Sequence, residues 1–136
     1  MQYPHGATIA VTDGRRLRIF RNDGDEVHLK LHELAEPKVE THGHGATRAH
    51  HGGNPNPTER RQEESGHATA VAHYLNGQVL AGHISSLYLV APPRALGELR
   101  PKFHAQLTQR LIGELGKEHT HDSLEHIHKA LAAVAA

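Results

Sequence analysis

The sequence predicts an α/β fold in which a mixed five-stranded sheet carries helices on its faces. Three observations support this class. Apolar and polar residues alternate before residue 36, which is typical of strands in an antiparallel meander. After residue 64, apolar residues recur three and four positions apart, which is typical of helices, and short apolar runs separate these segments. The expected order is strand-strand-strand-helix-strand-helix-strand-helix, with right-handed crossovers in the second half.

Three strands are expected before residue 36, separated by turn sequences that contain Asp and Gly. They span Thr8–Asp13, Arg15–Asn22 and Glu26–Leu34. The second strand alternates arginine with apolar residues, which predicts one buried face and one exposed, basic face. The residues on its basic face would be Arg16 and Arg18. The buried face of the third strand would consist of Val27, Leu29 and Leu31.

A long loop is expected after the third strand, from Glu36 to about Glu63. This segment is rich in His, Gly and Pro and has almost no large apolar residue. It cannot bury enough surface to offset the entropy lost on ordering, so we expect it to be flexible. Loops of this length in a compact domain are usually functional or disordered. The chain is therefore predicted to form one domain over residues 1–136 with a flexible loop at about 36–63.

The first helix is predicted to begin at Glu64 and to end near Gly82. Its buried face would consist of Ala68, Val71, Ala72, Leu75 and Val79. An apolar strand, Leu87–Val90, then leads through two prolines into a second helix. Because proline cannot donate the helical hydrogen bond, Pro101 predicts a kink or break around Arg100. The buried face of this second helical segment would consist of Leu96, Leu99, Phe103, Leu107 and Leu111.

A last strand and a closing helix complete the expected fold. Two glycines make the stretch Leu111–His119 a poor continuation of the preceding helix, so we expect a strand there. Asp122 is the expected N-cap of the closing helix, with Glu125 three residues later. The inner face of that helix would consist of Leu124, Ile127, Leu131 and Val134.

Composition excludes several classes of protein. The 136 residues contain 15 Lys and Arg against 15 Asp and Glu, so overall charge does not favour nonspecific nucleic-acid binding, and we predict no DNA partner. Cysteine is absent, which excludes disulfides and thiolate metal sites. No signal peptide or membrane-spanning run is seen, so a cytoplasmic location without membrane insertion is expected. The 15 histidines would charge in acid, which leaves a pH-responsive protein as one alternative.

Histidine clusters are the candidate metal ligands. His42, His44, His50 and His51 supply enough imidazoles for a zinc, nickel or copper site. The surrounding loop is Gly-rich and holds no ligand in place, so adventitious binding is the competing interpretation and no cofactor is required. A second group near the closing helix is expected to be a solvated helix face. It consists of His119, His121, His126 and His128.

Two further patterns concern nucleic acids. Asp13 ends the first strand, where a nuclease would carry a magnesium ligand, but it also opens an Asp-Gly turn and has no evident carboxylate partners, so a turn residue is expected. Six cations could form an anion-binding or RNA-phosphate-binding patch, because helix starts at strand ends commonly bind anions. They are Arg15, Arg16, Arg18, Arg94, Arg100 and Lys102. Ordinary solvated side chains are the competing interpretation.

Several motifs along the chain resemble one protein family. They are Pro4-His5-Gly6, Asp13-Gly14-Arg15, Leu87–Arg94 (LYLVAPPR), Leu96–Arg100 (LGELR) and Gly116–Thr120 (GKEHT). The resemblance is to bacterial host attachment proteins, which are also grouped with the bacterial archaeo-eukaryotic release factor families. It covers essentially the whole chain outside the 36–63 loop.

The resemblance implies an RNase H-like fold, similar to the middle domain of archaeal and eukaryotic translation termination factors. In those factors a Gly-Gly-Gln loop precedes the first long helix and enters the peptidyl-transferase centre. The corresponding residues here are Gly52, Gly53 and Asn54 in the expected loop.

The leading hypothesis is a non-enzymatic module that binds the ribosome or RNA through the 36–63 loop and nearby basic residues. A histidine-rich metal-binding or pH-responsive protein is the alternative from another class. Peptidyl-tRNA hydrolysis through Gly53 and Asn54 is the enzymatic alternative. The sequence leaves the partner and the oligomeric state open.

Overall fold

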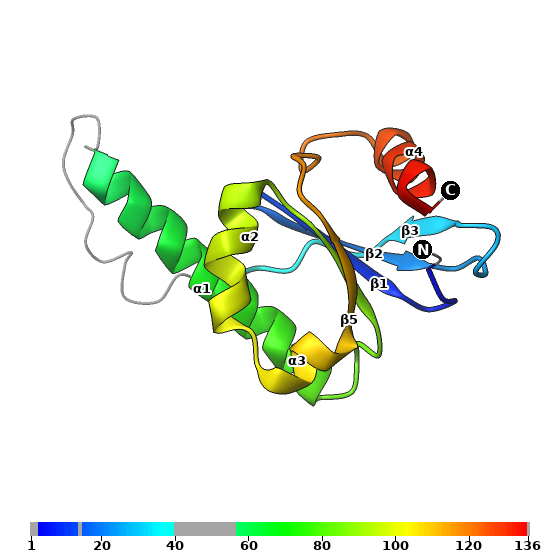
Figure 1. The fold of residues 1–136 in the computed structure, drawn as a ribbon, viewed down its shortest axis with the longest axis horizontal. Helices are drawn as coiled ribbons and strands as arrows, with labels where there is room; N and C mark the ends of the chain where they lie inside the picture. Colours follow the sequence, from blue (N-terminus) through cyan, green and yellow to red (C-terminus); the bar gives the residue numbers. More distant parts are fainter. Residues whose placement is uncertain (1–2, 14, 40–56, 136) are drawn as a thin grey trace.

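The computed structural model describes residues 3–13, 15–39 and 57–135, and its strands form one five-stranded sheet in the order β3-β2-β1-β4-β5 (Figure 1). The strands are β1 (Thr8–Thr12), β2 (Leu17–Asn22), β3 (Leu31–Glu33), β4 (Leu87–Val90) and β5 (Leu111–Leu115). The helices are α1 (Pro57–Leu80), α2 (Pro93–Leu99), α3 (Ala105–Arg110) and α4 (Leu124–Ala135), with a 3₁₀ turn at Arg100–Lys102 between α2 and α3. The predicted α/β class with a mixed five-stranded sheet is confirmed.

The sheet combines an antiparallel half with a parallel half. β1 pairs antiparallel with β2, and β2 pairs antiparallel with β3. On the other side, β1 pairs parallel with β4, and β4 pairs parallel with β5. The carboxyl ends of β1, β4 and β5 therefore meet at one edge of the sheet, which is where α/β proteins usually bind ligands. No helix in the described ranges is long and apolar enough to span a membrane.

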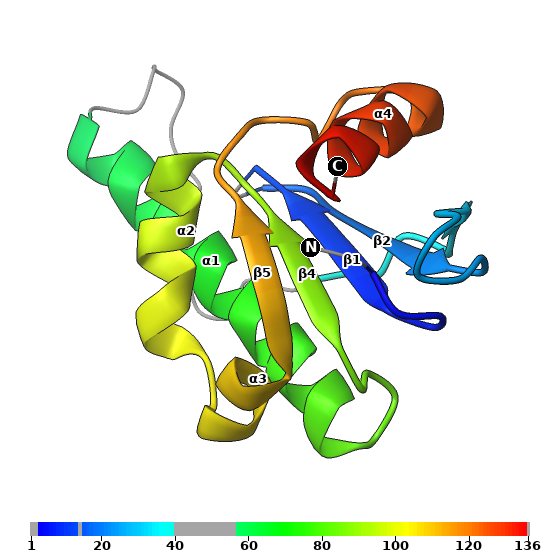
Figure 2. The same ribbon diagram turned by 45° about the vertical axis from the view of Figure 1, so that its right-hand side comes forward.

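Helices cover both faces of the sheet, as Figure 2 shows. Alternate strand residues supply two apolar clusters because successive side chains point to opposite faces. In β4, Leu87 and Leu89 pack in the cluster that includes α1, α2 and α3. Tyr88 and Val90 pack in the second cluster, which includes α4. The predicted buried face of the first helix is confirmed: Ala68, Val71, Ala72, Leu75 and Val79 are all buried.

The N-terminal segment is attached to the α4 side of the sheet. Tyr3 is buried, and its hydroxyl donates a hydrogen bond to the carbonyl of Leu131 in α4 at 2.8 Å. Its ring meets that of Tyr88 edge to face, with 5.1 Å between centroids. One aromatic residue therefore joins the start of the chain, the central sheet and the last helix.

The third strand is much shorter than predicted. The side chain of Asn22 accepts hydrogen bonds from the backbone N–H groups of Gly24 and Lys30, and Asp25 accepts from those of Val27 and His28. These side-chain bonds replace strand pairing with a looped turn. Regular pairing resumes only at Leu31–Glu33, and Val27 is 75% exposed rather than buried.

The first helix begins seven residues earlier than predicted. It starts at Pro57, so residues 57–63 are helical rather than part of the loop. Proline is well suited to the first helical position, since its fixed φ angle matches the helix and it lacks an N–H that would be unpaired there anyway. Residues 36–39 precede the helix without regular structure, and residues 40–56 lie outside the described ranges.

The helix after β4 breaks where Pro101 predicted. α2 ends at Leu99, and the following 3₁₀ turn contains Pro101. Asn76 of α1 supports the break, since its side chain donates to the carbonyl of Lys102 and accepts from the N–H of His104. α3 then ends at Arg110, and the next residue already belongs to β5.

The last two elements differ from prediction in detail. β5 ends at Leu115, four residues before the predicted end at His119. The side chain that caps α4 is Ser123, whose Oγ accepts from the N–H of His126 at 3.1 Å, so the N-cap prediction was one residue early. On the inner face of α4, Ile127 and Leu131 are buried, whereas the expected core residue Val134 is 38% exposed.

Candidate functional site

The turn after β1 places a carboxylate at the edge where the parallel strands end. The Oδ1 atom of Asp13 accepts hydrogen bonds from the backbone N–H groups of Arg15 and Arg16 at 2.8 and 2.9 Å. Its Oδ2 atom lies 3.2 Å from Nε2 of His121. Burial alone would raise the pKa of Asp13, but the backbone hydrogen bonds outweigh it and hold that pKa below its usual range. Asp13 is therefore an ionised turn residue, as predicted.

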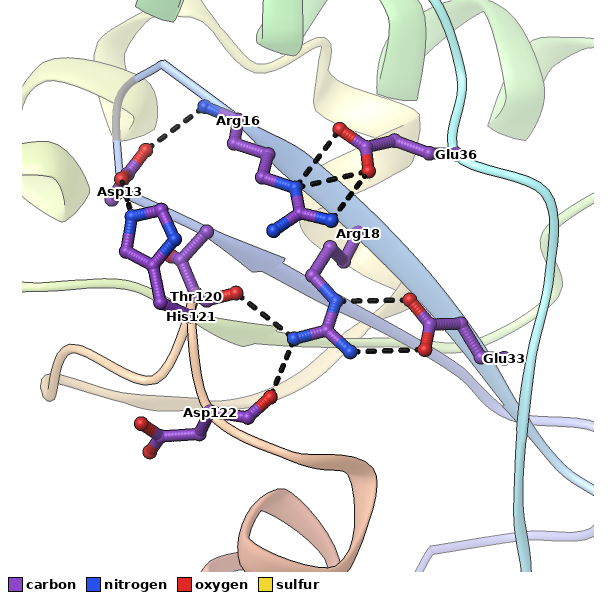
Figure 3. A network of polar contacts seen from close by, with 8 residues as sticks. All are labelled: Asp13, Arg16, Arg18, Glu33, Glu36, Thr120, His121 and Asp122. Atoms are coloured by element: carbon purple, nitrogen blue, oxygen red, sulfur yellow. Dashed lines mark hydrogen bonds and ion pairs between the residues drawn. The ribbon is translucent and has the colours of Figure 1, made fainter.

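Arg18 lies at the centre of a buried polar network (Figure 3). Its guanidinium donates to both carboxylate oxygens of Glu33 at 2.9 Å. Its Nη1 atom donates to the carbonyls of Thr120 and Asp122 at 2.9 and 2.7 Å. The same group lies 5.1 Å from the ring centroid of Phe20, within the range of a cation–π contact.

This network removes Arg18 from the predicted basic patch. The side chain is only 8% exposed, because the loop between β5 and α4 covers the face of β2 that was expected to be wet. Its donors already bind protein oxygens, so it cannot reach an RNA phosphate. The hydrogen bonds from Arg18 also hold the pKa of Glu33 below its usual range, so the carboxylate is ionised at neutral pH. Arg18 therefore positions the loop.

The other predicted cations are spread along the chain from the Asp13 turn to the 3₁₀ turn after α2. Arg16 forms an exposed ion pair with Glu36 at 2.9 Å, and Arg94 is exposed in the first turn of α2. Arg100 pairs with Glu114 at 2.6 Å. The seven residues of α2 carry the chain about 10 Å from the carboxyl end of β4, so Arg100 and Lys102 lie away from Arg15 and Arg16. Nζ of Lys102 donates to the carbonyl of Glu98 at 3.3 Å.

A hollow of about 480 Å³ opens beside the Asp13 turn. The polar side chains that line it are Arg15, Arg16, Glu36, Lys38 and His67. Three cations thus face one carboxylate, so the hollow has a net positive charge within a chain that is neutral overall. The sequence indicated Arg15 and Arg16, but it gave no sign that Lys38 and His67 join them, since both come from separate segments.

His67 gives the hollow a neutral imidazole. Burial lowers its pKa more than the nearby Asp13 raises it, and the charge of Arg15 lowers it further. Its Nε2 atom is buried and has no hydrogen-bond partner among the described residues. The residue thus lines the positively charged hollow without adding a charge, and its buried nitrogen is not exposed to solvent.

The histidines near α4 form the expected solvated face only in part, since the side chains of His121 and His126 are 70% and 67% exposed. The side chain of His119 is only 12% exposed, and Nε2 of His128 pairs with the carbonyl of Leu29 at 2.8 Å. His119 and His126 also approach Asp122, and the ligand atoms of these three residues all lie within 4.8 Å of one another. The sequence grouped the two histidines but assigned Asp122 to the helix cap, so it did not indicate that the carboxylate joins them.

Two predicted sites cannot be placed. The tripeptide Gly52-Gly53-Asn54 lies outside the described residues, as does the cluster of His42, His44, His50 and His51. Both remain predictions.

Comparison with known families decides what kind of domain carries these features. Residues 6–131 match the bacterial archaeo-eukaryotic release factor family 12. The chain belongs to this family. The resemblance predicted from the motifs is confirmed, and the family 12 chain is a release-factor-like, translation-related module. No curated protein matches it. The matched range includes the Asp13 turn, the residues that line the hollow and the start of α4.

Proposed function

We propose that this family 12 chain is a non-enzymatic module that associates with ribosomal RNA through the positively charged hollow. The single observation that carries the proposal is the convergence of Arg15, Arg16 and Lys38 at the sheet edge where α/β proteins bind ligands. Family membership supports a role in translation. The proposal includes an RNase H-like fold similar to a release-factor middle domain, which the strand order β3-β2-β1-β4-β5 supports.

The chemistry of the hollow suits RNA phosphates. Arginine offers a planar fork of donors that matches phosphate oxygens, and lysine adds a compact charge. Arg15 has its side chain exposed, since only its backbone N–H is used by Asp13. A volume of about 480 Å³ is in the usual range for ligand sites. Residues 36–39 line the hollow and begin the segment expected from the sequence to meet a partner.

The neutral net charge of the chain makes this proposal specific. A strongly basic protein would bind RNA through its net positive charge. This chain has no net charge, so we assign the attraction to the positive charges of the hollow. We infer a cytoplasmic location for the same reason that we infer a ribosomal partner, namely the translation-related family. The resemblance to host attachment proteins is compatible with a binding domain of this kind.

Co-sedimentation with bacterial ribosomes tests the proposal. The wild-type chain is expected to pellet with ribosomes, and to do so less as salt rises from about 50 to 200 mM. The double variant Arg15→Ala/Lys38→Ala is expected to bind at least roughly tenfold more weakly, with a salt slope reduced by about two. Failure of the wild-type chain to pellet at any salt concentration would refute ribosome association.

A matched control separates the hollow from general charge. Arg110→Ala/Lys129→Ala removes two exposed positive charges from α3 and α4, and Arg110 lies at the opposite edge, where β5 begins. This variant is expected to bind like the wild type. If both double variants lose affinity equally, the hollow is not the binding site.

A further inference from the structure

Three potential metal-binding side chains converge where the β5–α4 loop meets α4. They are His119, Asp122 and His126, at positions i, i+3 and i+7. Nδ1 of His119 lies 2.6 Å from Oδ2 of Asp122, and Nε2 of His126 lies 3.8 Å from the same oxygen. The two imidazole rings are tilted by 44° with 5.9 Å between centroids. One oxygen and two nitrogens thus lie within 4.8 Å of one another.

These distances suit a small tetrahedral cation. Zinc binds imidazole nitrogen and carboxylate oxygen at about 2.0–2.2 Å, so two of its ligand atoms lie about 3.3 Å apart. The observed separations of 2.6 and 3.8 Å fall on either side of that value. The contact at 2.6 Å would open slightly to admit the ion. The 3.8 Å contact would close by a small rotation of the His126 side chain, which is 67% exposed.

The donor set selects a class of metal. Two imidazoles with one carboxylate are typical ligands of zinc and neighbouring divalent transition metals, whereas magnesium and calcium prefer oxygen ligands. The increasing exposure of the side chains, from 12% for His119 through 34% for Asp122 to 67% for His126, leaves one side of the group open to solvent. Three protein ligands with one open position is the arrangement of zinc sites that also bind water.

The framework holds the ligands before any metal arrives. Nη1 of Arg18 binds the carbonyl of Asp122 at 2.7 Å, and the N–H of Asp122 donates to the carbonyl of His119 at 3.0 Å. Ser123 caps α4 and so fixes the turn that carries His126. These contacts fix the backbone that carries the three side chains. Asp122 at Nδ1 and the His126 ring both contact the His119 ring, whereas its buried Nε2 atom has no hydrogen-bond partner among the described residues.

We propose that His119, Asp122 and His126 form a binding site for one divalent transition-metal ion of the zinc class. The site is distinct from the positively charged hollow, and it would lock the β5–α4 loop onto the first turn of α4 while leaving one coordination position for water. It is independent of the proposed RNA contact. It is also distinct from the histidine cluster at residues 42–51.

Zinc titration of the full, untagged chain at neutral pH tests this site. Calorimetry is expected to show one tight equivalent of Zn²⁺, and thermal unfolding is expected to shift upward as zinc is added, because ligands that bind the folded state stabilise it. Cobalt(II) is expected to give the visible absorption of a four-coordinate ion. Absence of a stoichiometric binding event would overturn the proposal.

Variants assign the binding event to its residues. His126→Ala and Asp122→Asn change exposed or half-exposed side chains, so both chains should fold, which circular dichroism would verify. Each is expected to weaken zinc binding at least roughly tenfold. Loss of a hydrogen bond to a metal ligand already lowers affinity by about tenfold or more, and loss of the ligand itself should cost at least as much. His73→Ala, which removes an exposed histidine of α1, is the matched control and should bind like the wild type.

A second control addresses the sequence-predicted cluster. The quadruple variant His42→Ala/His44→Ala/His50→Ala/His51→Ala should keep the tight equivalent. If that variant loses the binding event while His126→Ala and Asp122→Asn keep it, the site is in the 42–51 segment and the proposal is wrong.

Discussion

Arg16 and Arg18 are two positions apart on the same stretch of chain, and each pairs with a glutamate. The ion pair between Arg16 and Glu36 lies in the open, with side-chain exposures of 42% and 41%. In the pair between Arg18 and Glu33, the exposures are 8% and 33%. The guanidinium of Arg18 also binds two backbone carbonyls, whereas Arg16 lines the open hollow.

The difference between the two arginines comes from what covers them. The alternating pattern of Arg16, Leu17, Arg18 and Ile19 places both arginines on the same predicted face. The loop that reaches Arg18 lies about a hundred residues further along the chain and brings the carbonyls of Thr120 and Asp122. A cation that the chain encloses becomes part of the framework, while an exposed cation has only a weak, solvent-screened ion pair that a partner can replace.

Replacing Arg18 should have the largest effect. Arg18→Ala leaves Glu33 without its partner and two carbonyls without their donor, so the free energy of unfolding is expected to fall by about 3 kcal/mol. Urea denaturation measures this loss. Arg18→Lys keeps the charge but lacks the fork that reaches three partners, so it should lose an intermediate amount. A loss below about 1 kcal/mol for Arg18→Ala would show that the network adds little to stability.

Acid should abolish much of the difference between wild type and Arg18→Ala. The folded-state pKa of Glu33 is lowered by Arg18, below the ordinary value of 4.5. A lowered carboxyl pKa stabilises the fold above pH 4.5, and this contribution is lost as the pH falls through the folded-state pKa. The gap in unfolding free energy between the two proteins should therefore be widest near neutral pH and narrow below pH 4.5. A gap of constant size across this range would contradict the ion-pair interpretation.

Replacing Arg16 should have the smallest effect on stability. The exposed pair with Glu36 gains little in water, so Arg16→Ala should lose roughly a fifth of the Arg18→Ala effect or less. The same denaturation experiment measures it. Ribosome co-sedimentation should instead respond to Arg16→Ala, because the variant removes a cation from the hollow. If Arg16→Ala lost as much stability as Arg18→Ala, the exposed ion pair would matter as much as the buried one and the comparison would be wrong.

Most of the fold could be predicted because its signals are local. The apolar spacing in Ala68, Val71 and Leu75 defined the buried face of α1, and Pro101 marked the break after α2. Errors arose where a side chain competes with the backbone. Asn22 and Asp25 each accept hydrogen bonds from two backbone N–H groups. These bonds form a turn over the first half of the segment that was predicted to be the third strand.

The candidate sites could be predicted only in part, because they join distant segments. The alternating pattern in β2 predicted which face of the sheet carries Arg18. It could not show that the loop between β5 and α4 covers that face. In the same way, Lys38 and His67 meet in the hollow although no short motif contains both. The spacing of His119, Asp122 and His126 was visible in the sequence, but its meaning depended on where α4 begins.

The hydrogen bond from Tyr3 to Leu131 has a consequence for how the chain is made. It joins residues 128 positions apart, and Arg18 joins partners 102 and 104 positions away. Contacts between residues so far apart in sequence form slowly, because the entropy of closing a long loop is lost before the contact stabilises the fold. During synthesis, the apolar sheet face that contains Phe20 and Tyr88 would stay exposed to solvent until α4 leaves the ribosome and packs on it. α4 is thus the helix that completes this face of the core.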